Sequence, residues 1–210
     1  LPESKSLREA EAEMATGNRE KLLETGVELL SKKSYSSITM DEVAEMSGVT
    51  KPMIYYYFDS KEGFYKALAN HMLDMGKALV VKVFDPRKSL RQALYDLVEL
   101  RLELTRTKPA LARAFLMMLH DPNLGLIIEG MQKKMQDLWQ VVRPTLERAK
   151  KNGEIRPDAD TTLVLMMVNT ASIGYMMRIL KGIDNPPLPD ARQIVDVVFD
   201  GIGGEGREGV

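Results

Sequence analysis

Apolar residues recur every three or four positions through most of the chain, which is the pattern of amphipathic helices. The most regular stripe predicts one continuous helix from Ser60 to about Asp85, and its members are Phe64, Leu68, Met72, Met75, Leu79 and Val83. Similar stripes predict helices at residues 18–33, 89–107, 109–120, 124–152, 160–183 and 190–202. Since no segment alternates apolar and polar residues as a strand does, the sequence predicts an all-α fold.

Between the first predicted helix and the long one, the residues indicate two short helices joined by a turn. Thr39 and Glu42 have the spacing of a capping box, in which the hydroxyl accepts a free backbone N–H and the carboxylate reaches back. Gly48 tolerates the left-handed conformation that often ends a helix. Thr50 is predicted to cap the second helix, with Pro52 in its first turn, where a missing N–H costs little.

The exposed face of the second short helix decides between a DNA-binding and a purely structural pair. Val49, Ile54 and Phe58 are predicted to face inward. The three tyrosines at 55–57 are hard to bury together on so short a helix. Phenolic hydroxyls donate to phosphates, and Lys51 can reach guanine acceptors in the major groove, which favours a DNA-binding helix-turn-helix. The alternative is that the tyrosines are ordinary core residues.

A specific set of residues follows in fixed order through this region: Ala44, Gly48, Val49, Tyr55, Phe58, Ser60, Lys61 and Glu62. The set resembles the signature of the tetracycline-repressor (TetR) family, whose DNA-binding domain ends a short recognition helix with Tyr-x-x-Phe and continues with Ser-Lys-Glu. The length and helical character of the rest of the chain also suit that family.

By position, the resemblance implies DNA contacts from Thr39, Thr50, Lys51, Pro52, Met53, Tyr55, Tyr56, Tyr57 and Lys61. Lys51, Pro52 and Tyr56 are the expected base readers, and the others are expected to hold phosphates. Pro52 stands where the family frequently has Gly or Ala, so the start of the helix is expected to dock a little differently.

Composition narrows the alternatives. The formal net charge is −1, so DNA binding would depend on locally placed lysines such as Lys51 and Lys61, doubled in a dimer, rather than on an overall field. The chain has no cysteine, which excludes disulfides and zinc–thiolate sites. Its two histidines lie on different predicted helices, and no catalytic motif is present, so no catalytic residue, metal or cofactor is predicted.

No apolar run approaches the roughly 20 residues that span a bilayer, and the first residues lack the apolar core of a signal peptide. The sequence therefore predicts a cytoplasmic protein with no membrane partner.

Many of the 14 methionines lie in the second half of the chain, where flexible thioethers suit an adaptable apolar cavity for a small apolar effector. Its candidate ligand-binding residues are Phe115, Met118, His120, Met135, Trp139, Met166 and Asn169. The alternative is a methionine-rich core without a cavity.

The last two predicted helices carry more apolar surface than one core-facing stripe requires, and this surface would be buried either inside the protein or against a second copy in a homodimer. The resemblance implies a four-helix interface at this place. Two-fold symmetry would then put two recognition helices about 34–36 Å apart and predicts a palindromic operator in double-stranded DNA.

The predicted organisation is a loose N-terminal arm at 1–16, a helix-turn-helix domain at 17–63, a ligand-binding and dimerisation domain at 64–203, and a flexible tail at 204–210. The predicted function is a ligand-responsive repressor that binds its operator as a dimer and is released by an effector of unknown identity. A ligand-independent helical DNA-binding factor and an all-α enzyme are the rival interpretations.

Overall fold

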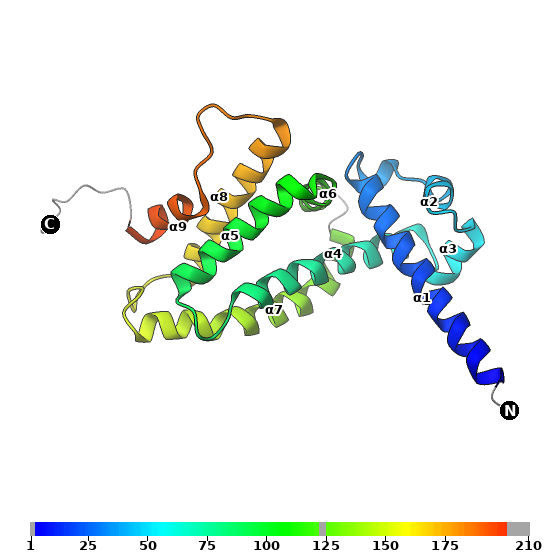
Figure 1. The fold of residues 1–210 in the computed structure, drawn as a ribbon, viewed down its shortest axis with the longest axis horizontal. Coiled ribbons are helices and arrows are strands. Elements are labelled where there is room, and N and C mark those ends of the chain that lie inside the picture. Colours follow the sequence, from blue (N-terminus) through cyan, green and yellow to red (C-terminus); the bar gives the residue numbers. More distant parts are fainter. Residues whose placement is uncertain (1–2, 122–124, 201–210) are drawn as a thin grey trace, which may run out of the picture. The chain divides into compact units, whose positions relative to one another are not determined.

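The computed structural model describes the backbone of residues 3–121 and 125–200, and the side chains of residues 16–121, 132–134 and 136–200. Within these ranges the regular structure is helical, as predicted (Figure 1). The α-helices are α1 (Glu3–Leu30), α2 (Met40–Ser47), α3 (Lys51–Phe58), α4 (Lys61–Val83), α5 (Leu90–Thr107), α6 (Pro109–Leu119), α7 (Gly125–Lys151), α8 (Thr161–Lys181) and α9 (Ala191–Asp200), with a 3₁₀ turn, η1, at Tyr35–Ser37.

The chain packs as two compact units. The first comprises Leu1–Asp74 with Ala110–Gln132, and the second comprises Met75–Pro109 with Lys133–Val210. Helix α4 is continuous and contributes to both. This packing division is separate from the functional boundary predicted between residues 63 and 64, which stays a prediction.

The first helix is longer than the sequence pattern indicated. α1 begins at Glu3, so the segment predicted as a loose arm is helical from there on, and it ends at Leu30 rather than at Lys33. The polar, charged residues of the arm carry no apolar stripe, and the sequence indicated there at most a frayed helix at residues 6–14. The predicted tail at 204–210 lies outside the described residues.

Local sequence signals account for the two short helices of the first unit. The Thr39 hydroxyl accepts a hydrogen bond from the Glu42 amide, and the Glu42 carboxylate accepts one from the Thr39 amide, so the predicted capping box is present. Gly48 ends α2 in the left-handed region at φ 67°. Thr50 occupies the cap position of α3, but its side chain makes no capping hydrogen bond there, contrary to the prediction.

The core of the first unit closes around the residues predicted to face inward. Val49, Ile54 and Phe58 are all buried. α1 and α4 approach closely at Gly26, where an added Cβ would lie 2.8 Å from Phe64 Cζ. A Cβ at Gly63 would lie only 1.9 Å from the Phe58 carbonyl oxygen, so the turn from α3 into α4 requires glycine.

The second unit is built on α5, which packs against α8 and α9; α5 and α8 lie side by side in Figure 1. The Glu154 carboxylate accepts hydrogen bonds from the backbone amides of Leu90 and Arg91, at the start of α5. The Arg91 guanidinium pairs with Asp196 and Asp200 of α9. These contacts tie the loop after α7 and helix α9 to the start of α5.

Helix α8 is long and apolar enough to cross a membrane by length and composition, and it is the one such helix in the described part of the chain, with a mean hydropathy of 1.5. Core helices of globular proteins pass the same test. In this unit Val168, Ser172 and Met176 are the buried positions of α8, while other apolar residues of the helix are exposed.

Candidate nucleic-acid interface and ligand cavity

Helix α3 presents its polar and aromatic residues on the side opposite the core. Its buried positions are Ile54 and Phe58, and the helical repeat therefore turns the intervening positions outward. Thr50, Lys51 and Pro52 are exposed. Tyr56 is the most open, with 76 % of its surface exposed, and Tyr55 is 40 % exposed. Such large exposed aromatic side chains are available for contact with another molecule.

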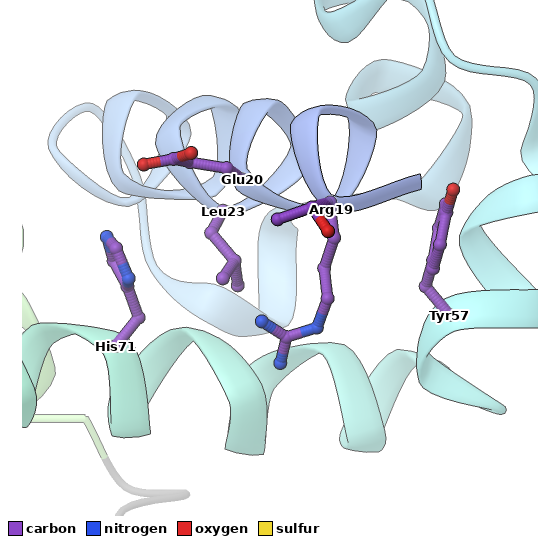
Figure 2. A pocket seen from close by; sticks show the side chains of 6 residues that line it. Arg19, Glu20, Leu23, Tyr57 and His71 are labelled. Carbon is purple, nitrogen blue, oxygen red and sulfur yellow. The ribbon is translucent and has the colours of Figure 1, made fainter. Parts of the chain in front are cut away.

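Met53 and Tyr57 lie on the flanks of α3 instead. Both are half-buried and pack against the core of the first unit. Tyr57 lines a cleft of about 400 Å³ between α1 and α4, together with Leu23 and His71. Figure 2 shows Arg19 reaching from α1 toward α4 in this cleft, and its guanidinium lies 5.5 Å from the centre of the Phe58 ring. Tyr57 and Met53 therefore have less surface to offer than Tyr56.

The lysines at this surface are held by neighbours. Lys51 Nζ lies 2.9 Å from Asp41 of α2, and this hydrogen bond raises the pKa of Lys51. Lys61 Nζ donates to the Ser36 carbonyl oxygen at 3.1 Å and lies 4.9 Å from the centre of the Tyr35 ring. A phosphate that approached Lys51 would compete with Asp41 for the ammonium group.

The Thr39 hydroxyl is engaged in the capping box, where it also lies 3.0 Å from a Glu42 carboxylate oxygen. The Lys33 ammonium pairs with the same carboxylate, and its hydrogen bond, with those from Thr39, lowers the pKa of Glu42 to about 2. Lys33 thereby supports the start of α2 from the turn that follows α1. Thr39 remains exposed beside this network.

A buried polar junction joins η1, α4 and the end of α6 within the first unit. The Tyr35 and Tyr65 rings stack with centres 3.8 Å apart. The Tyr35 amide donates to the Asp121 carboxylate at 3.3 Å. Burial raises the pKa of Tyr65 to about 12, with Asp121 and Tyr35 adding to the shift. This junction has no counterpart among the predicted site residues, because its members are far apart in sequence.

A second cavity, of about 360 Å³, lies within the second unit. Its walls are mostly apolar side chains from α5, α7 and α8, with the end of α4, and they include Val80, Phe84, Leu94, Leu97, Leu138, Val142, Leu165 and Val168. Three residues predicted as ligand contacts, Trp139, Met166 and Asn169, are brought together in its wall. The polar lining residues are Asn169, Thr162 and Arg101.

The other predicted ligand residues lie elsewhere. Met118 is fully buried in the core of the first unit, and Phe115 packs against that core. His120 is exposed, with its Nδ1 atom 2.8 Å from the Leu116 carbonyl oxygen. The Met135 side chain lies outside the described residues. Methionine content alone could not separate these positions, since a core and a cavity wall use the same side chains.

Arg101 was missed by the sequence interpretation although a signal was available. Leu94, Leu97 and Arg101 share one face of α5, at spacings of three and four residues. An arginine that continues an apolar stripe lies on the packed side of its helix, and Arg101 is half-buried there. Its position in the stripe marked it as a candidate site residue.

Comparison with known proteins supports the interpretation of the first unit. Residues 22–68 match the family model described as "Bacterial regulatory proteins, tetR family". The HTH-type transcriptional regulator RutR of Escherichia coli (strain K12) is 28 % identical over 152 residues, which cover 72 % of this chain and 71 % of RutR.

Solved structures share the fold of most of the chain. A TetR family transcription regulator from Marinobacter aquaeolei VT8 superposes with a TM-score of 0.76 at 17 % identity, covering 90 % of this chain and 97 % of the other. The transcriptional regulator FadR of Bacillus subtilis, solved in complex with stearoyl-CoA, has a TM-score of 0.71 at 17 % identity, covering 87 % and 98 %. The helix-turn-helix geometry, the match of residues 22–68 to the TetR family model and the shared fold together support a DNA-binding transcriptional regulator of the TetR family.

Proposed function

We propose that this regulator is a ligand-responsive repressor that binds a palindromic operator as a homodimer and leaves it when a small, largely apolar effector fills the cavity of the second unit. The observation that carries the DNA-binding half is the exposed outer face of α3, with Tyr56 at its centre. Tyr55 and Tyr56 are exposed on that face and do not belong to the core of the first unit.

The proposed contacts divide by exposure and chemistry. Lys51, Pro52 and Tyr56 are proposed to meet base edges in the major groove, because all three are exposed on α3. Thr39, Thr50, Tyr55 and Lys61, with the half-buried Met53 and Tyr57 on the flanks, are proposed to contact the backbone. Since Lys51 already pairs with Asp41, exchanging that carboxylate for DNA should add little net affinity per charge.

The cavity supports ligand control. At about 360 Å³ it lies at the lower end of the roughly 300–1,000 Å³ typical of small-molecule sites, and its wall is mostly apolar with a few polar groups. FadR, which shares the fold, was solved with stearoyl-CoA, so this fold is compatible with effectors that carry an apolar chain. A ligand that favours one conformation of the second unit would shift the population of DNA-competent protein.

The exposed apolar residues of α8 and α9 support the homodimer. They are Leu163, Met166, Met167, Met177 and Val197. No side chain lies within 4 Å of a Cβ built at Gly174, so a partner helix can approach there. Several large apolar side chains exposed on two packed helices favour a partner that covers them, and a second copy of the same helices would do so.

No enzymatic activity is proposed, and a bacterial transcriptional regulator is expected to act in the cytoplasm, where its operator lies.

Selection of bound duplexes from a random DNA library, with purified protein at low salt, tests the proposed function. Enrichment of an inverted repeat whose half-sites are about one helical turn or a multiple of it apart is expected for a two-fold dimer. Enrichment of single, unpaired sites would contradict the dimeric operator. Failure to enrich any sequence, repeated after unfolding and refolding to remove a copurified effector, would contradict sequence-specific DNA binding.

A further inference from the structure

The cavity of the second unit contains one cationic side chain, Arg101, among the described residues that line it. The surrounding wall includes Leu94, Leu97 and Trp139. Their side chains have no oxygen atom that could accept a hydrogen bond from the guanidinium. An arginine in such a wall places a permanent positive charge beside apolar space. That charge needs an electrostatic or hydrogen-bonding counterpart if it is to be buried at low cost.

The protein supplies only a neutral counterpart within the described residues. Arg101 Nη1 donates to the Asn169 side-chain oxygen at 2.9 Å, and no described carboxylate forms an ion pair with Arg101. A guanidinium has five N–H donors, of which this bond uses one. The Arg101 side chain is half-buried, and desolvation at this place lowers its pKa to about 10.

Other arginines of the second unit show the opposite arrangement. Arg91 pairs with Asp196 and Asp200, and the hydrogen bond to Asp200 raises the pKa of Arg91. Arg143 pairs with Glu147 at 2.6 Å, which raises its pKa in the same way. These side chains already have their anions. Arg101 is the one that faces the cavity, and its neighbour there is an uncharged amide.

We propose that the cavity accepts an amphiphile in which an apolar tail fills the space beside Trp139 and a single oxyanion headgroup pairs with Arg101. This proposal rests on the proposed function, because it names the chemical class of the effector. A carboxylate and a phosphate monoester both offer two oxygens to the planar fork of a guanidinium, and such pairs form strong, bidentate hydrogen bonds. Asn169 would hold the guanidinium in position until the headgroup arrives.

The chain carries its own reporter for this site. Trp139 is the only tryptophan, and it lines the cavity with 38 % of its surface exposed. A tail that packs against the indole ring will change its fluorescence. Titration of the full chain, without DNA, therefore measures binding at the cavity directly.

The experiment compares four probes of one tail length, namely decanoate, decyl phosphate, decanol and decylamine, by Trp139 fluorescence. At least one anionic probe is expected to bind more tightly than decanol, by roughly ten- to hundredfold, because a hydrogen bond to a charged group contributes about 1.5–3 kcal/mol. Decylamine is expected to bind most weakly, since it brings a second cation to Arg101. The ratio of the affinities for decanoate and decyl phosphate shows whether the site prefers a carboxylate or a phosphate headgroup.

Arg101→Gln removes the charge, and it is expected to lower the affinity for the anionic probe to that of decanol. Arg106→Gln is the matched control, because Arg106 lies on the same helix, is exposed and is not part of the cavity wall. Asn169→Asp is a second, independent variant. It places a carboxylate beside Arg101, and it is expected to abolish the preference for anions while keeping the protein folded.

The proposal is overturned if decanol binds as tightly as both anions, if neither anion alters the Trp139 fluorescence, or if folded Asn169→Asp keeps the full preference for anions. These outcomes are separate from the DNA selection. Enrichment of an operator with no anion preference would reject this inference and leave the regulator function in place. Anion binding without operator enrichment would support this inference and contradict sequence-specific DNA binding.

Discussion

The two units use the same kind of helical apolar stripe but reach different interiors. In the first unit, Phe64, Tyr65 and Met118 are fully buried and the stacked rings of Tyr35 and Tyr65 fill the centre. In the second unit, the apolar faces of α5, α7 and α8 leave a cavity of about 360 Å³ with Arg101 in its wall. A filled core holds one arrangement of helices, whereas a cavity leaves part of the packing to a ligand.

The difference fits the proposed division of tasks, in which the first unit binds DNA and the second unit binds the effector. A DNA-binding unit that must match the spacing of a DNA groove benefits from a core with little freedom to rearrange. A sensing unit must gain stability when its ligand binds, and an unfilled apolar cavity provides that gain. Substitutions that change the packing of the first unit are therefore expected to lower its stability strongly.

The largest expected effect is on the filled core. Met118→Ala should lower the free energy of unfolding by about 2–5 kcal/mol, because it removes a fully buried side chain and leaves a cavity. Met117→Ala on the same helix is the control, since Met117 is 37 % exposed and its truncation should cost much less. Urea unfolding of both variants provides the measurement. Equal losses of unfolding free energy in the two variants would show that Met118 is not packed more tightly than the exposed Met117.

The turn between α3 and α4 is a second place where a substitution should destabilise the first unit. Gly63→Ala should lower the free energy of unfolding by about 1–3 kcal/mol, because its Cβ would lie 1.9 Å from the Phe58 carbonyl oxygen and the backbone must shift. Gly76→Ala in the same helix meets no atom within 4 Å and should instead stabilise by up to about 1 kcal/mol. Thermal unfolding of the pair separates a steric clash from the general preference of helices for alanine. A stable Gly63→Ala protein would contradict the close approach.

Titration of Tyr65 sharpens the picture of the filled core. The pKa of Tyr65 is raised from 10.0 to about 12, mainly by burial, so the folded state holds the phenolic proton more tightly than the unfolded state. The protonated phenol therefore contributes to the free energy of unfolding, and this contribution is fully present below pH 10. It is lost as the pH rises toward 12, and the loss is on the order of 1–2 kcal/mol. The loss appears as a fall in unfolding free energy across that range.

Tyr65→Phe isolates the effect, because the buried Tyr65 hydroxyl has no hydrogen-bond partner in the described structure. The variant should match or exceed the wild-type stability at pH 8, since removing an unsatisfied buried hydroxyl relieves its desolvation cost. It should also lose the part of the alkaline destabilisation that Tyr65 causes. An unchanged pH profile would show that Tyr65 does not titrate as a buried phenol.

The success of the sequence interpretation follows from the distance over which each feature is encoded. The capping box of Thr39 and Glu42, the left-handed Gly48 and the buried face of α3 depend on residues within a few positions of each other, and all were predicted from the sequence. Helix periods likewise predicted α4 as one continuous element. Local physical chemistry is sufficient for such features.

Features that depend on distant partners were not predictable in the same way. Met118 and Trp139 belong to the same class of apolar residue on amphipathic helices, yet one fills the core of the first unit and the other lines the cavity of the second. Which neighbours meet such a side chain depends on tertiary packing. The Tyr35–Asp121 bond spans 86 positions and had no local signal at all.

The smallest expected effect on stability belongs to Tyr56, which faces away from both interiors. Tyr56→Ala should change the free energy of unfolding by less than about 0.5 kcal/mol, because 76 % of the side chain is exposed and its truncation opens no cavity. Binding to the selected operator should nevertheless weaken by at least roughly tenfold, the value of a single good base contact. Tyr57→Ala is the informative contrast, since Tyr57 packs against the core and should lose more stability than Tyr56→Ala. If Tyr56→Ala binds the operator as tightly as the wild type in a fluorescence anisotropy titration, the outer face of α3 does not read DNA through this ring.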